Sequence, residues 1–155
     1  MIESINRVIL ASDHGGYELK QEVIKYLTDN NIEFKDVGCD SNESCDYPDF
    51  AHLGGALINP QELGIFICGS GNGINMAANS HKQIRSALCW IEEIASLARL
   101  HNNANIMCLP GRFISTEEAI KCVDVFLNTE FEGGRHLNRI NKIKHIGYYS
   151  KNIEK

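Results

Sequence analysis

Strand-like and helix-like segments alternate along this chain, and this alternation constrains the fold more than any other feature of the sequence. Short apolar runs, such as residues 7–12 and 63–68, are typical of buried strands. Segments with apolar residues at helical spacing separate them, as with Leu19, Val23 and Leu27. Such alternation implies parallel strands joined by right-handed helical crossovers. The sequence predicts an α/β fold: a single doubly wound, Rossmann-like domain whose five-stranded parallel sheet is flanked by helices.

The expected elements follow one another without a linker or an internal repeat, so residues 1–155 are expected to form one domain. The helix expected at 115–128 opens with a Ser115-x-x-Glu118 capping box. After Asn128 the chain becomes basic and helical in its second half, which predicts a C-terminal helix, and residues from about 146 to 155 are expected to form a tail. Strands are expected at 7–12, 32–38, 63–68, 84–90 and 105–110, and helices at 17–31, 48–58, 74–81, 91–101 and 115–128.

Composition and charge narrow the classes of protein to which the chain can belong. Its 155 residues, 43% of them hydrophobic, suit one domain with one substantial core. A formal net charge of -5 argues against partners found by bulk attraction to nucleic acid or to an anionic membrane. No uncharged apolar run approaches the roughly 20 residues that span a bilayer, and the N-terminus lacks the apolar stretch of a signal peptide. We expect a cytoplasmic protein.

The cysteines are scattered rather than paired by motif. None forms a C-x-x-C pair or a Cys/His zinc spacing, so neither a disulfide framework nor a metal site is expected. Several lie inside apolar runs, where cysteine is an ordinary core residue. The six are Cys39, Cys45, Cys68, Cys89, Cys108 and Cys122.

Three predicted strands end in loops that carry polar or glycine residues. Asp13 and His14 follow the first strand, residues 68–73 follow the third, and residues 109–112 follow the fifth. Because the carboxyl ends of parallel strands meet at one edge of a sheet, these loops are expected to share a rim. Glycines at 69, 71 and 73 allow a tight turn and close approach to a ligand, and the next helix offers unpaired N–H groups for an anion.

A nucleotide site is the first alternative for this glycine loop. The Gly-Lys-Ser/Thr ending of a P-loop is absent, and the dinucleotide fingerprint fails where Ile74 replaces its third glycine. Glu92, however, lies where a ribose-binding acid would fall, so a non-catalytic nucleotide or sugar-phosphate binding module stays open. A plain glycine-rich turn stays open as well.

Cys68 and His101 are the candidate reactive side chains. A thiol at a helix N-terminus can have its pKa lowered from about 8.5, which would make Cys68 a base or a nucleophile, whereas a buried strand end would leave it inert. His101 lies where a helix is expected to end, a place that also suits a capping histidine. A thiol hydrolase built on Cys68, His101 and Asp13 is a third function class, but it leaves the arginines unexplained.

Three arginines indicate a designated anion in an acidic protein. Arg135 and Arg139 are four residues apart and would share one face of a helix, and Arg112 follows the fifth strand. Taken alone, these arginines are better explained by a solvated helix face beside Glu130 and Glu132.

In chain order, a series of motifs carries a more specific signal than any single loop. They are "ASDHGGYELK", "DYPDFA", "ICGSGNGINMAAN", "ARLHNNANIMCLPGR" and "FEGGRHLNRI". Together they resemble the ribose-5-phosphate isomerase type B family, which forms one group of sugar-phosphate isomerases with the galactose-6-phosphate isomerase subunits. The resemblance covers nearly the whole chain apart from its first few residues and its tail.

The resemblance implies a role for each matching residue. Cys68 resembles the catalytic base, Asp13 and His101 the pair that opens the sugar ring, and the loop from Gly69 to Gly73 the anion hole, so that the catalytic set is Cys68, Ser70, Asp13 and His101. Some family members carry a glutamate at the position of Ile74 and no cysteine at that of Cys68, so this chain resembles the cysteine-base branch. The implied substrate-binding residues are His14, Tyr47, Gly69, Gly71, Asn72, Gly73, Asn102, Arg112, Arg135 and Arg139.

The resemblance also implies the assembly and the reaction. Family members are homodimers or tetramers of dimers, and the active site lies at the subunit interface, with the His101 and Asn102 equivalents donated by the neighbouring chain. The implied reaction interconverts ribose 5-phosphate and ribulose 5-phosphate through an enediolate, in the non-oxidative branch of the pentose phosphate pathway, and requires no cofactor. Six-carbon sugar phosphates stay open as substrates.

Overall fold

The computed structural model describes residues 2–144, so the predicted tail at 146–155 lies outside the described residues. Strands and helices alternate through the described chain, and a sixth helix follows. The strands are β1 (Arg7–Ser12), β2 (Phe34–Asp36), β3 (Glu62–Cys68), β4 (Ser86–Leu88) and β5 (Ile106–Pro110), and the helices are α1 (Tyr17–Asp29), α2 (Tyr47–Leu57), α3 (Asn72–Asn79), α4 (Glu92–Asn102), α5 (Thr116–Asn128) and α6 (Arg135–Lys142).

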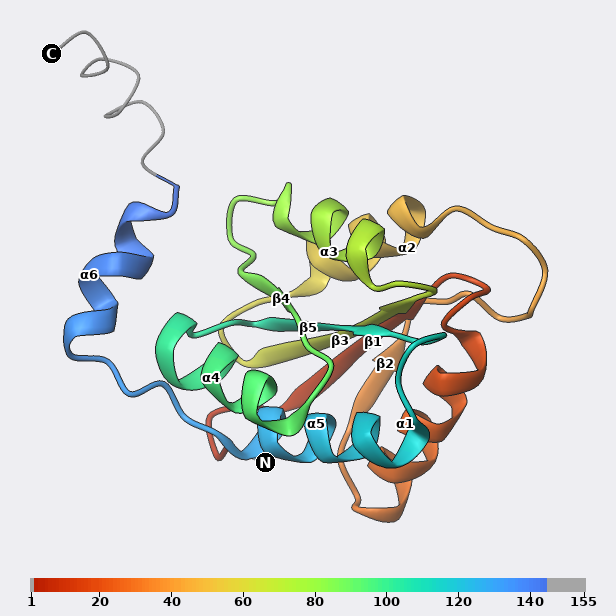
Figure 1. The fold of residues 1–155 in the computed structure, drawn as a ribbon, viewed down its shortest axis with the longest axis horizontal. Helices are drawn as coiled ribbons and strands as arrows, with labels where there is room; N and C mark the ends of the chain where they lie inside the picture. The colour runs from red at the N-terminus through yellow and green to blue at the C-terminus, as the bar shows by residue number, and fades with distance from the viewer. Residues whose placement is uncertain (1, 145–155) are drawn as a thin grey trace, which may run out of the picture.

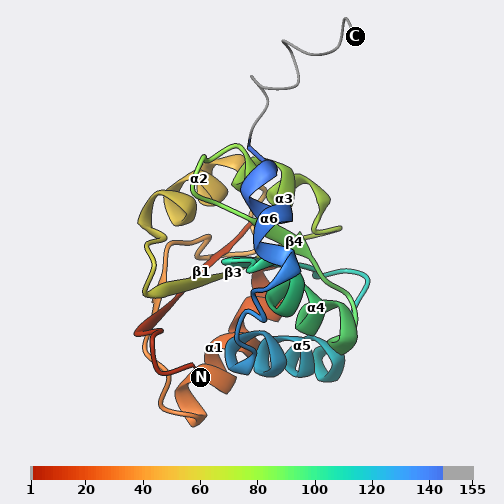
Figure 2. The same ribbon diagram turned by 90° about the vertical axis from the view of Figure 1, so that its left-hand side faces the viewer.

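The strands form one parallel sheet in the order β2-β1-β3-β5-β4. Helices α1, α4 and α5 cover one face, and α2 and α3 cover the other (Figures 1 and 2). The predicted doubly wound α/β fold is therefore confirmed. The connection after β1 leads to β2 on one side of it, and the next connection crosses to β3 on the other side. Such a change of direction creates the crevice in which doubly wound folds bind ligands.

Alternation along the central strands divides the core into two layers. Leu10, Ile65 and Leu109 point to the layer under α1, α4 and α5. Ile9, Phe66 and Cys68 point to the layer under α2 and α3. Since β1, β3 and β5 are covered on both faces, their sequences are continuous apolar runs, which explains why the sequence reveals them so clearly.

The two outer strands are shorter than predicted. Residues 32–38 and 84–90 were expected to be strands, but β2 spans Phe34–Asp36 and β4 spans Ser86–Leu88. Each lies at an edge and pairs with a single neighbour, β1 or β5. Fewer partners limit the length of ladder that an apolar run can form.

The predicted capping box forms only in part. Ser115 Oγ accepts a hydrogen bond from the Glu118 N–H (3.2 Å), which caps α5. The Glu118 carboxylate accepts instead from the Glu92 N–H (2.9 Å), at the first residue of α4. One helix thus caps its neighbour, and this holds the first turns of α4 and α5 together.

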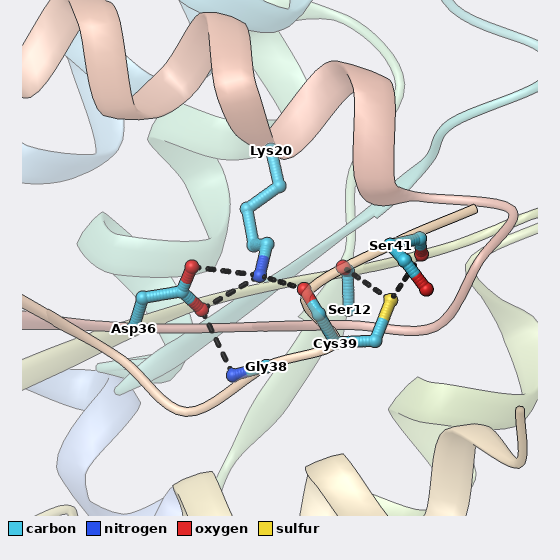
Figure 3. A network of polar contacts seen from close by, with 6 residues as sticks. All are labelled: Ser12, Lys20, Asp36, Gly38, Cys39 and Ser41. Carbon is cyan, nitrogen blue, oxygen red and sulfur yellow. Dashed lines mark hydrogen bonds and ion pairs between the residues drawn. The ribbon is translucent and has the colours of Figure 1, made fainter. Parts of the chain in front are cut away.

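A buried ion pair ties α1 to the end of β2, and a further hydrogen bond reaches the segment that follows (Figure 3). Lys20 is fully buried, and its Nζ donates to Asp36 Oδ1 (2.7 Å), Asp36 Oδ2 (2.8 Å) and the Cys39 carbonyl (2.7 Å). The Gly38 N–H also donates to Asp36 Oδ1 (2.9 Å). Every proton of the ammonium group has an acceptor, which is the condition under which a lysine tolerates burial.

Candidate active site

The loops after β1, β3 and β5 meet at the carboxyl ends of these strands. The Asp13 N–H donates to the Ile67 carbonyl (3.2 Å), the Gly111 N–H to the Cys68 carbonyl (2.9 Å) and the Arg112 N–H to the Gly69 carbonyl (3.0 Å). Gly15 packs so closely that a Cβ there would lie 2.9 Å from the Gly69 nitrogen. The predicted shared rim is confirmed. We call Asp13, His14, Tyr47, Cys68, residues 69–73 and Arg112 the rim cluster.

The glycine loop of this cluster is narrow and leads directly into α3. Gly71 has φ +74°, and a Cβ there would lie 3.1 Å from the Leu109 carbonyl oxygen. Tyr47 lies against Gly73, where a Cβ would come 2.5 Å from Tyr47 Cζ. Ser70 Oγ accepts from the Asn72 N–H (3.3 Å). Both glycines are needed where they stand, and the open N–H groups of the first turn of α3 lie at the rim.

Cys68 is the last residue of β3, and its exposure differs from that expected for a thiol at the lip of a loop. It is 4% exposed and belongs to the core layer under α2 and α3, with Ile74 and Cys108. The glycine loop turns over it, since alternation on β3 sends this side chain to the face that α3 covers.

Three of the other cysteines, Cys89, Cys108 and Cys122, lie in the apolar core, as several were predicted to do. All six are free, and Cys39, Cys89, Cys108 and Cys122 are buried. Burial raises the pKa of Cys89 and of Cys122 to about 12, and it raises that of Cys108 further. Cys108 lies beside Cys68 but stays protonated, so it does not compete as a base.

Two hydrogen bonds orient the polar residues after β1. Asp13 is buried, and its Oδ1 accepts from the Gly16 N–H (3.2 Å). His14 Nδ1 accepts from the Cys45 N–H (3.3 Å). A neutral His14 with Nδ1 as acceptor carries its proton on Nε2, where it is available to an anion.

A second group of predicted site residues lies at the opposite end of the strands, where β5 begins. His101 and Asn102 end α4, which leads into the start of β5, whereas the rim cluster lies beyond the end of β5. The four steps along β5 correspond to about 13 Å. Arg135 and Arg139 are exposed on α6, which contacts α4 (Figure 1). One chain therefore does not bring Asp13 and His101 together, nor all of the predicted phosphate-binding residues.

Two residues that the sequence did not single out complete this second group. The His136 ring stacks on the His101 ring, with centroids 4.2 Å apart and planes at 13°. Glu132 Oε2 lies 3.8 Å from His101 Nε2 and 3.4 Å from His136 Nε2. Burial, followed by the charges of His101 and Arg135, lowers the pKa of His136. The signal in the sequence that could have identified these two residues is their four-residue spacing, Glu132-x-x-x-His136. It lies in a motif from which we selected only the arginines. We call His101, Asn102, Glu132, Arg135, His136 and Arg139 the α4–α6 cluster.

The candidate ribose-binding acid is not beside the glycine loop. Glu92 begins α4 after β4, and β5 lies between β4 and β3. In dinucleotide-binding folds the acid follows the strand adjacent to the glycine-loop strand. The nucleotide-binding alternative therefore gains no support from the geometry.

Comparison with known proteins decides the family. A family model described as Ribose/Galactose Isomerase matches residues 8–143. The chain belongs to the ribose/galactose isomerase family. The resemblance predicted from the motifs is thus confirmed, and members of the family catalyse sugar-phosphate isomerisation, which makes this chain an isomerase.

Relatives in this family share most of their length with the chain. The probable ribose-5-phosphate isomerase B of Mycoplasma pneumoniae is 48% identical over 139 residues, which cover 88% of this chain and 91% of that protein. The crystal structure of a ribose 5-phosphate isomerase from Thermotoga maritima superposes with a TM-score of 0.87 at 48% identity and covers 90% of this chain and 98% of that one.

One relative has been solved with a ligand. Ribose-5-phosphate isomerase B from Mycoplasma genitalium, with bound ribulose 5-phosphate, superposes with a TM-score of 0.86 at 43% identity. It covers 93% of this chain and 96% of that one.

In the described part of this chain, 2–144, no helix has both the length and the hydropathy to cross a membrane.

Proposed function

We propose that this family member interconverts ribose 5-phosphate and ribulose 5-phosphate. The observation that carries the proposal is the rim cluster, in which a thiol, a glycine loop at a helix start and Arg112 meet in a chain 43% identical to a relative with bound ribulose 5-phosphate. We further propose that it acts in the cytoplasm, in the non-oxidative branch of the pentose phosphate pathway.

Each group in the proposed mechanism has one task. Asp13 and His101 move a proton between the ring oxygen and the hydroxyl, which opens the sugar. Cys68 is proposed as the base that takes the proton from C2 of the aldose and returns it to C1, while a proton passes from the C2 hydroxyl to the C1 oxygen. N–H groups of the loop 69–73 and the Ser70 hydroxyl stabilise the enediolate, whose negative charge develops at the rim.

The phosphate needs a local basic cluster because the protein is acidic overall. His14, Arg112, Arg135 and Arg139 are proposed to bind the phosphate, and charge-assisted hydrogen bonds of this kind contribute about 1.5–3 kcal/mol each. Tyr47 and Asn102 are proposed to contact the sugar. A phosphate held far from C1 and C2 positions those carbons against Cys68.

We infer that a complete site needs two chains. The rim cluster and the α4–α6 cluster lie at opposite ends of the strands, yet the mechanism requires Asp13 and His101 at one sugar. A homodimer in which the α4–α6 cluster of one chain faces the rim cluster of its partner satisfies both conditions. Two such dimers can form a tetramer.

Replacing Cys68 tests the proposed base. In a coupled assay of ribulose 5-phosphate formation, Cys68→Ala is expected to lower kcat by about 10²–10⁴-fold, the usual contribution of a general base. Cys122→Ala removes a buried thiol on α5, away from the rim, and is expected to keep most of the activity at 25 °C. Undiminished turnover in Cys68→Ala would remove the thiol from the mechanism.

A six-carbon substrate is the second candidate, because the matching family is described as Ribose/Galactose Isomerase. Turnover of ribose 5-phosphate, allose 6-phosphate and galactose 6-phosphate by one purified sample separates the two. We expect ribose 5-phosphate to have the highest kcat/KM. A higher value for either hexose phosphate would reassign the substrate.

A further inference from the structure

Three potential metal ligands converge in the α4–α6 cluster. Nitrogen or oxygen atoms of His101, Glu132 and His136 all lie within 4.8 Å of one another. They come from the last turn of α4, the segment between α5 and α6, and the first turn of α6. Two imidazoles and a carboxylate form a donor set that suits Zn²⁺, Co²⁺ or Ni²⁺.

His136 provides an independent sign that something belongs between these groups. It is 4% exposed, and its Nε2 is buried without a hydrogen-bond partner in the described structure. Glu132 Oε2 lies 3.4 Å from this nitrogen, beyond the usual range of a hydrogen bond. An unprotonated Nε2 would face the carboxylate with its lone pair. A cation between the two atoms satisfies both.

The spacing fits a metal better than a direct contact. With metal–nitrogen and metal–oxygen distances of about 2.0–2.2 Å, two ligand atoms of a tetrahedral site lie about 3.4 Å apart. The His136 Nε2 to Glu132 Oε2 distance is 3.4 Å, and the His101 Nε2 to Glu132 Oε2 distance is 3.8 Å. Because the two rings are stacked with their planes at 13°, one ring must turn before both Nε2 lone pairs can meet a single ion. Within one chain His101 has room to turn, because its side chain is 37% exposed there.

The surrounding charges act in both directions. The C-terminus of α4, where His101 lies, favours a cation. Arg135 and Arg139 on α6 oppose one, and both are exposed, so solvent screens their charges. Three ligands leave a fourth position for water or an anion.

We propose that His101, Glu132 and His136 bind a transition-metal ion of the Zn²⁺ type, which clamps α6 onto α4 and withholds His101 from the sugar. Metal binding stands on the cluster alone, whereas the inhibition that follows rests on the proposed function. The site would make the isomerase sensitive to free zinc, with sugar phosphate and metal competing for His101.

Cobalt titration tests the binding directly. Co²⁺ added to the full-length protein is expected to give a saturable tetrahedral absorption band in the visible region at one ion per chain, and Zn²⁺ should abolish it. Glu132→Gln and His136→Asn should each lower Co²⁺ affinity at least 10-fold. The matched controls Glu130→Gln and His52→Asn should not, since both residues are exposed and outside the cluster. Circular dichroism checks folding, and Glu132, 58% exposed, is the substitution least able to disturb it.

The outcomes separate the two parts of the proposal. No visible band, or a band that survives both Glu132→Gln and His136→Asn, overturns the metal site. If the band behaves as expected but Zn²⁺ leaves turnover of ribose 5-phosphate unchanged, the inhibition is wrong. If the protein has no isomerase activity at all, the proposed function fails while the cobalt result still decides the metal site.

Discussion

Among single residues, Lys20 has the clearest link between chemistry and fold. A fully buried ammonium is stable only with its acceptors, and Asp36, whose side chain is 25% exposed, provides the compensating charge. Lys20→Met would leave the Asp36 carboxylate with only the Gly38 N–H as a donor, and it would leave the Cys39 carbonyl without its ammonium donor. We expect a loss of about 3 kcal/mol in the free energy of unfolding, the lower end for a broken buried pair, measured by urea denaturation.

Lys121→Met is the matched control for this prediction. Lys121 pairs with Glu117 at 2.7 Å, but both side chains are largely exposed on α5. Solvent screens such a pair, so the urea midpoint should change far less than in Lys20→Met. Equal midpoints for the two variants would show that the buried pair is not important for stability.

Site residues were predictable where the motif lay next to a strand end. Asp13 and Arg112 follow central strands and Cys68 ends one, so topology alone brings them to one rim. His136 was not predictable in this way, because its contact with His101 joins two helices that are distant in sequence. The burial of Cys68 depends on which face of β3 it occupies, and an all-apolar strand carries no periodic signal for that.

At the scale of elements, capping explains how α5 begins and can be tested by one substitution. Ser115→Ala removes the acceptor for the Glu118 N–H and is expected to lower the free energy of unfolding by about 1 kcal/mol. Urea denaturation measures the change, with Ser44→Ala in the exposed loop before α2 as the control. A loss no larger than that of the control would mean that solvent replaces the cap.

How clearly the sequence predicted each helix or strand depends on how the faces of that element are covered. The three central strands and the helices were visible as apolar runs or helical periodicity. The ends of β2 and β4 were overestimated, because an edge strand is limited by its single partner, which no local pattern reports. Glu118 was expected to return a hydrogen bond within its own helix, but tertiary packing places it at the start of α4.

For the whole molecule, the proposed two-chain site predicts complementation between inactive variants. Cys68→Ala and His101→Asn should each lack activity, since each breaks every site of its own dimer. In a hybrid dimer one site carries both substitutions and the other carries neither. Random pairing after co-expression makes about half of the dimers hybrid, so about a quarter of the wild-type activity should return.

The same coupled assay, run on the two variants mixed without subunit exchange, is the control and should show no recovery. Co-expressed chains that stay inactive would mean that Cys68 and His101 act within one chain, which contradicts the two-chain site.

The separation of the rim cluster from the α4–α6 cluster has a consequence for how such an enzyme behaves when scarce. A lone chain holds each half at a different end of the strands and has no complete site, so turnover depends on association. Specific activity should then fall on dilution below the dimer dissociation constant, and substrate that bridges two chains should oppose that fall. The rate of isomerisation would then depend on protein concentration in two ways, through the number of chains and through the fraction of them that is assembled into dimers.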